Sequence, residues 1–151
     1  IEHIGDKAQM LRHVRRFLAP GGVVFIGFPA WQMPFGGHQQ ICHSKAASHW
    51  PFLHLLPCWL YRRVLKICGE SDSCINVLLD IKSCATTIEM FEDLAVRTGY
   101  AICHRKFWFI NPHYEVKFHL RPRVLFPVLA HIPYVRNFFT TSCFYILQTV
   151  D

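Results

Sequence analysis

Much of the expected fold follows from one stretch, Leu18-Ala19-Pro20-Gly21-Gly22-Val23-Val24-Phe25-Ile26-Gly27-Phe28-Pro29. Its first part stops a helix, because Pro20 and the two glycines after it do not continue one. Its second part, residues 23–28, is a continuous apolar run rich in strand-forming residues. Such a run without polar alternation is typical of a parallel strand covered by helices on both faces. The stretch therefore predicts a turn followed by a buried strand that ends at Pro29.

The residues before this stretch predict a helix. Asp6 and Gln9 have the spacing of a capping box at a helix start. Apolar residues then recur at helical spacing as far as Leu18. A helix that leads into a buried strand is typical of an α/β protein with a parallel sheet.

Residues 30–85 interrupt this pattern. They begin with a cluster rich in glycine, proline, histidine and tryptophan, and continue as short helical pieces, of which residues 58–68 are the clearest. The segment is too long for an ordinary connection between a strand and the next helix. We expect a helical insertion, or cap, on the scaffold.

Regular elements return after the insertion. Thr86 and Glu89 have the spacing of a second capping box, and the helix that follows is expected to end at Gly99. Residues 100–110 and 142–150 are predicted strands, and residues 112–140, broken by four prolines, are predicted to be a loop. Because no crossover helix is evident between them, these last two strands can lie antiparallel at one edge of the sheet.

Composition excludes several classes of protein. Hydrophobic residues make up 52% of the chain, which is too apolar for a disordered protein. The net charge is +6 but no basic run occurs, so we expect no nucleic-acid partner. The seven cysteines are scattered and form no C-x-x-C pair, which favours a reducing, cytoplasmic location. Cys42 and His43 lie near His38 and His49 in the sequence, but their spacing matches no common zinc module, so no metal site is predicted.

Four landmarks occur in a fixed order: Glu2-His3, Leu18-Ala19-Pro20-Gly21-Gly22, Phe28-Pro29 and Thr98-Gly99-Tyr100. In this order they resemble the second half of a class I S-adenosylmethionine-dependent methyltransferase. The resemblance implies the C-terminal half of a Rossmann-like methyltransferase sheet, with parallel strands, an antiparallel terminal strand pair and a helical insertion at 30–85. Residues 1–151 would then be a single partial methyltransferase domain.

The resemblance also implies a function. The expected activity is methyl transfer from S-adenosyl-L-methionine to a small-molecule or lipid-type acceptor. The family's glycine-rich cofactor loop, G-x-G-x-G, does not occur in the chain. We therefore expect a fragment that carries the acceptor side and is inactive alone. The alternative is a non-catalytic, methyltransferase-like binding module or a membrane-peripheral module.

Glu2 and His3 are the first candidate site residues. By the resemblance they close a strand that opens onto the reaction site, so we expect both to line the cofactor pocket. His3 could also act as a general base, since histidine exchanges protons near neutral pH. Two alternatives stay open: a purely structural role, and a share in a metal site with a carboxylate that would precede Ile1.

His38 is the second candidate catalytic residue. Gly36 and Gly37 precede it, and glycines allow a loop to bring a side chain close to a ligand. It follows the predicted strand and could reach the acceptor, together with Phe28, Pro29, Trp31 and Phe35. The alternatives are a histidine that only caps the next segment and aromatic residues that only pack in the core.

Residues 50–66 combine apolar and basic side chains. They could rest on a membrane surface or cover a lipid-like acceptor. More often such a face packs on the scaffold. The expected location is therefore cytoplasmic, with membrane-peripheral contact as a further option.

Overall fold

The computed structural model describes residues 1–150 and contains one mixed α/β unit. Its sheet has four strands in the order β1-β4-β2-β3, and every neighbouring pair is antiparallel. The strands are β1 (Val23–Phe28), β2 (Tyr100–Ile110), β3 (Arg123–Val124) and β4 (Ser142–Thr149). β1 and β2 both run opposite to β4, so their carboxyl ends lie at the same end of the sheet.

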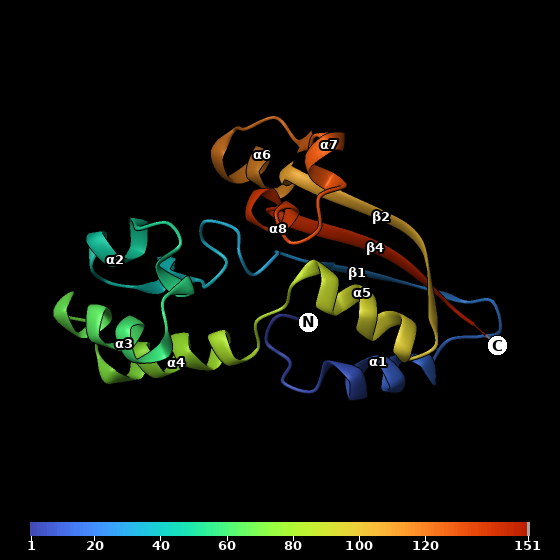
Figure 1. The fold of residues 1–151 in the computed structure, drawn as a ribbon, viewed down its shortest axis with the longest axis horizontal. Helices are drawn as coiled ribbons and strands as arrows, with labels where there is room; N and C mark the ends of the chain where they lie inside the picture. Colours follow the sequence, from blue (N-terminus) through green and yellow to red (C-terminus); the bar gives the residue numbers. More distant parts are fainter. Residues whose placement is uncertain (151) are drawn as a thin grey trace.

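Helices lie beside this sheet and beyond one of its ends (Figure 1). The α-helices are α1 (Lys7–Arg15), α2 (Lys45–His49), α3 (Cys58–Ile67), α4 (Asp72–Ser83), α5 (Ile88–Arg97), α6 (His113–Phe118), α7 (Pro127–Ala130) and α8 (Arg136–Phe139). Two short 3-10 helices are η1 (Gln39–Ile41) and η2 (Leu53–Leu55). Among the described residues no helix is both long and apolar enough to cross a bilayer.

The prediction of a Rossmann-like sheet with parallel strands is wrong. β4 returns between β1 and β2 and hydrogen-bonds to both, so the described strands contain no parallel pair. The continuous apolar run of β1 does not reflect two covered faces either. Val23 and Phe25 are 57% and 61% exposed, whereas Phe28 is buried. Only one face of β1 is covered by described residues.

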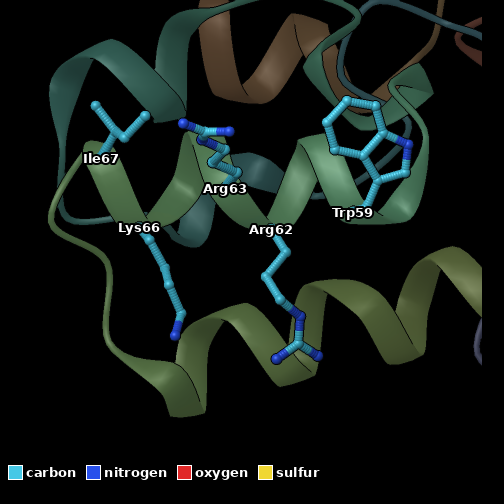
Figure 2. A pocket seen from close by; sticks show the side chains of 5 residues that line it. All are labelled: Trp59, Arg62, Arg63, Lys66 and Ile67. Atoms are coloured by element: carbon cyan, nitrogen blue, oxygen red, sulfur yellow. The ribbon is translucent and has the colours of Figure 1, made fainter.

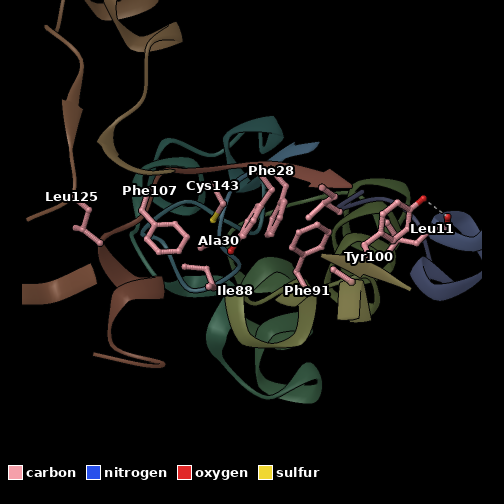
Figure 3. Packing of buried hydrophobic residues seen from close by; sticks show 12 residues of the cluster. Leu11, Phe28, Ala30, Ile88, Phe91, Tyr100, Phe107, Leu125 and Cys143 are labelled. Carbon is pink, nitrogen blue, oxygen red and sulfur yellow. Dashed lines mark hydrogen bonds between the residues drawn. The ribbon is translucent and has the colours of Figure 1, made fainter. Parts of the chain in front are cut away.

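The main core lies between that covered face and the helices α1 and α5 (Figure 3). Phe28 and Phe91 pack with ring centroids 4.8 Å apart, and Phe91 packs on Tyr145 at 4.7 Å. The Tyr100 hydroxyl, deep in the same core, donates a 2.8 Å hydrogen bond to the carbonyl of Leu11. That bond satisfies a polar group whose burial would otherwise cost free energy.

Residues 39–83 form a helical layer with a core of its own. Figure 1 shows α2, α3 and α4 gathered at one end of the molecule, beyond the carboxyl end of β1. Their second core is centred on Tyr61, Leu65, Ile75 and Leu78, which are fully buried. The amphipathic faces of α3 and α4 therefore pack mainly against each other.

The predicted loop at 112–140 is instead largely ordered structure. It holds α6, β3, α7 and α8, and an ionic network ties α8 to α5. Arg136 donates to Glu89 and to Glu92, each at 2.9 Å, and its own side chain is only 7% exposed. Pro112 is the N-cap of α6 and Pro127 is the first residue of α7, so prolines in this segment do not imply irregular backbone.

The capping box predicted at Thr86 does not form, and the N-cap of α5 lies one residue later. Thr87 caps α5 by accepting from the backbone N–H of Met90. Thr86 is buried and donates to the carbonyl of Cys84. The Glu89 carboxylate accepts from the side chain of Asn137 and from the backbone N–H of Tyr134. It therefore bonds to residues at and before α8 and not to the start of its own helix.

Candidate functional site

A hollow of about 370 Å³ lies at the end of the sheet where β1 and β2 finish and β4 begins. Three segments that are distant in the sequence meet around it: the loop after β1, residues 111–117 after β2, and residues 141–142 at the start of β4. Its lining consists of Pro29, Met33, Phe35, His38, Gln40, Ile41, Asn111, Tyr114, Lys117, Thr141 and Ser142.

Glu2, His3 and His38 come together at the edge of this hollow. Glu2 Oε1 lies 3.6 Å from His3 Nε2 and 3.6 Å from His38 Nε2. The two imidazole rings meet edge to face with centroids 5.1 Å apart. A carboxylate is thus shared by two histidines from segments 35 residues apart in the chain. This set offers ligand atoms within 4.8 Å of one another, so it could also hold a cation.

The loop before His38 is shaped by close packing. A Cβ on Gly36 would lie 2.2 Å from the carbonyl oxygen of Trp31, and one on Gly37 would lie 2.1 Å from the Cβ of His54. The left-handed backbone conformation falls on His38 itself, at φ 57°. The glycines therefore serve close approach, and the histidine takes the strained angle, a feature that clusters at functional sites.

His54 supports this loop from within. It is fully buried and donates from Nε2 to the Trp31 carbonyl at 2.7 Å. Burial lowers the pKa of His54 to about 4, against the opposing effect of that hydrogen bond. The imidazole is therefore neutral at physiological pH, and its Nδ1 has no hydrogen-bond partner among the described residues.

Comparisons of the chain with protein-family models, curated proteins and solved structures found no match. The functional interpretation therefore rests on the side chains at this end of the sheet.

The predicted acceptor residues divide into two groups. Pro29, Phe35 and His38 line the hollow. Phe28 lies in the main core, stacked on Tyr145 with a centroid distance of 5.9 Å. Trp31 packs edge to face on His54 and does not line the hollow. The structure thus brings three of the five predicted residues to one site.

Asn111, Tyr114 and Lys117 line the same hollow but were missed in the sequence. They belong to the segment predicted as a loop, and their signal was an Asn-Pro pair directly after a strand.

Burial raises the pKa of the Tyr114 hydroxyl, so this group stays a proton donor. Asn111 Oδ1 is buried without a hydrogen-bond partner among the described residues, and so is Glu2 Oε2. Native proteins rarely leave such atoms unpaired, so both acceptors are available to a ligand.

Proposed function

We propose that this chain carries the acceptor side of an S-adenosylmethionine-dependent methyltransferase. The observation that carries the proposal is the meeting of Glu2, His3 and His38 beside the hollow at the carboxyl ends of β1 and β2. The order of the four sequence landmarks supports the same function, since two of them supply residues to this place. Fold alone would say little about function.

The residues present fit the methyl donor. The partnerless Glu2 Oε2 is a buried acceptor that could take a hydrogen bond from the donor's hydroxyl or ammonium groups. The Glu2 carboxylate would also attract the positively charged sulfonium of the donor. The imidazole ring of His3 lies next to this carboxylate and offers a flat surface against which the donor could pack. S-adenosylmethionine, when bound, supplies a methyl group on a positively charged sulfur. Glu2 and His3 are the residues that we assign to holding it.

His38 is the residue that we assign to proton removal from the acceptor. A carboxylate close to one ring nitrogen favours the proton on that nitrogen. With Glu2 facing Nε2, Nδ1 of His38 is left with the lone pair that accepts a proton. This arrangement follows the general logic of a base oriented by a third group. The acceptor would then be a hydroxyl or a comparably weak nucleophile, because a strong nucleophile needs no base.

The hollow limits what the acceptor can be. Phe35 and Tyr114 provide aromatic surface, while Gln40, Asn111 and Lys117 provide polar groups. A volume of about 370 Å³ is at the lower end for small-molecule pockets. We therefore propose a small molecule or the head region of a lipid-type molecule as the acceptor.

Methyl transfer tests this proposal directly. The protein is incubated with methyl-labelled S-adenosylmethionine and with fractionated small-molecule and lipid extracts. We expect label in one fraction, and His38→Ala should reduce turnover by about 100-fold or more, as loss of a general base does. His104→Ala, an exposed histidine in the middle of β2, is the matched control and should leave turnover unchanged. Absence of labelled product in every fraction would reject the enzyme in favour of a binding module.

A second candidate function, contact with a membrane surface, is favoured by α3. Figure 2 shows Trp59, Arg63 and Ile67 on the side of α3 away from α4, whereas Arg62 and Lys66 point toward α4. Trp59 and Ile67 are 67% and 77% exposed and line a shallow hollow of about 400 Å³. Exposed tryptophan beside arginine suits the boundary between lipid headgroups and acyl chains.

Liposome co-sedimentation separates this contact from ordinary surface exposure. We expect the protein to bind vesicles that contain anionic lipid, and Trp59→Ala combined with Arg63→Glu to abolish binding. Arg97→Glu reverses an exposed charge on α5, as Arg63→Glu does on α3, and is the control for net charge. Equal binding by both variants would show that α3 is not the contact surface.

A further inference from the structure

A buried cluster of metal-binding side chains lies in the helical layer, among the residues of its separate core. Cys42 follows η1, Glu70 lies in the turn between α3 and α4, and Cys74 is in the first turn of α4. Their two sulfur atoms and a carboxylate oxygen lie within 4.8 Å of one another. In a tetrahedral zinc site with Zn–S bonds of about 2.3 Å the sulfurs are about 3.8 Å apart, so only a small adjustment is needed.

Glu70 is an unusual carboxylate for such a position. Its side chain is fully buried, and its two oxygens accept from the backbone N–H groups of Ser44 at 2.8 Å and His43 at 3.2 Å. Burial acts to raise the pKa of Glu70, but these hydrogen bonds outweigh it and the pKa is lowered. Glu70 is therefore a buried anion.

No lysine or arginine neutralises this charge in the part of the chain that the structure describes. The partner that comes within ion-pair distance is His43, whose Nδ1 lies 3.6 Å from Glu70 Oε2. Two thiols fill the other side, and burial raises the pKa of Cys42 to about 12 and also raises that of Cys74. The described residues therefore surround the Glu70 carboxylate with hydrogen-bond donors and two thiol groups, but with no lysine or arginine.

We propose that Cys42, Cys74 and Glu70 form a structural zinc site, with His43 as the fourth ligand. Two thiolates, one imidazole and one carboxylate match the borderline-soft character of Zn²⁺. Binding would displace one proton from each thiol, so that two Zn–S bonds form and two protons are released to solvent. The metal would join the loop at residues 42–43 to the turn between α3 and α4.

This site differs from the methyl-transfer site in position and in role. Its residues do not line the hollow at the end of the sheet. Zinc would hold together the helical layer that carries the His38 loop, because η1 lies between His38 and Cys42. Cys42 and His43 were considered as zinc ligands from the sequence, but no zinc site was predicted, because Glu70 follows only after a 26-residue gap and Cys74 four residues later.

Metal titration of the full-length, reduced protein tests the proposal. We expect one Zn²⁺ to bind per chain by calorimetry, with an enthalpy that depends on the buffer because protons are released. Co²⁺ in its place should give the visible bands of a tetrahedral site and an ultraviolet band from thiolate bonding. No metal binding at micromolar concentration, or a Co²⁺ spectrum without thiolate bonding, would overturn the proposal.

Substitutions locate the metal. Cys74→Ser should weaken zinc binding by more than about 100-fold, beyond the effect expected for a supporting outer residue. Cys103→Ser, an exposed thiol on β2, is the control and should leave the affinity unchanged. His43→Ala should weaken binding less, since water can replace the fourth ligand. Because Cys74→Ser could disturb folding, circular dichroism is compared for all variants, and the wild-type Co²⁺ spectrum stands as a test independent of them. Unchanged affinity in a folded Cys74→Ser protein would contradict the site.

Discussion

Acidification should destabilise the protein through a single buried histidine, His54. Its pKa is about 4 in the folded protein against 6.5 for an unperturbed histidine. The unfolded chain therefore takes up a proton near pH 6.5, while the folded protein does not until near pH 4. Because the unfolded state binds more protons in this window, the free energy of unfolding falls as the pH drops through it.

The expected size follows from the two pKa values. Each pH unit between them corresponds to about 1.4 kcal/mol, so the neutral imidazole accounts for about 3 kcal/mol between pH 6.5 and pH 4. Carboxylates with lowered pKa values, such as Glu70 and Glu89, act in the same direction. Their contribution is present above pH 4.5 and is lost at lower pH. The two effects therefore fall in different windows.

Urea unfolding across about pH 7.5 to about pH 4 measures this dependence. His54→Gln keeps a donor for the Trp31 carbonyl but has no titrating group. We expect this variant to be less stable at neutral pH and to lose about 3 kcal/mol less than the wild type on acidification. His104→Gln, an exposed position, should keep the wild-type slope. An unchanged slope in His54→Gln would show that His54 is not the source of the pH dependence.

Two further changes test the packing. Arg136→Ala should cost about 3–5 kcal/mol in the free energy of unfolding, because it leaves the carboxylates of Glu89 and Glu92 largely buried without their main cation; urea midpoints check this, and a loss below about 1 kcal/mol would contradict it. Gly37→Ala should lower the free energy of unfolding by about 1–3 kcal/mol, since its Cβ would collide with the side chain of His54. A Cβ on Gly5 meets nothing within 4 Å, so Gly5→Ala should be neutral in thermal unfolding.

Individual elements could be predicted because their signals are local. Asp6 caps α1 by accepting from the backbone N–H of Gln9, as its spacing predicted. Gly69 and Gly99 follow α3 and α5 with positive φ, the conformation that ends helices. Caps and terminal glycines act within one turn of the chain, so they can be read without knowledge of the tertiary structure.

Strand pairing could not be predicted because it is not local. Nothing within residues 23–28 tells that β4, more than a hundred residues later, pairs with β1. The exposed Val23 and Phe25 have the same residue types as a strand buried on both faces. Apolarity therefore indicated a strand but not its neighbours.

Some residues of the candidate site were predicted from the sequence and others were not. His38 was predicted as a site residue from the glycines before it, although those glycines avoid collisions with Trp31 and His54 and neither of them has a positive φ. Asn111 and Tyr114 were missed because four prolines made their segment look irregular. Short helices that are held by an ionic network on another element leave little periodic pattern of their own.

The coupling between Glu2 and His38 shows whether this carboxylate orients a catalytic base. If Glu2 orients the base, kcat for methyl transfer should fall by about 100-fold or more in His38→Gln, and the Glu2→Gln/His38→Gln double variant should be no slower than the slower single variant. Steady-state kinetics on the four proteins provides the double-mutant cycle. Wild-type turnover in both single variants, or effects that multiply in the double variant, would contradict the account.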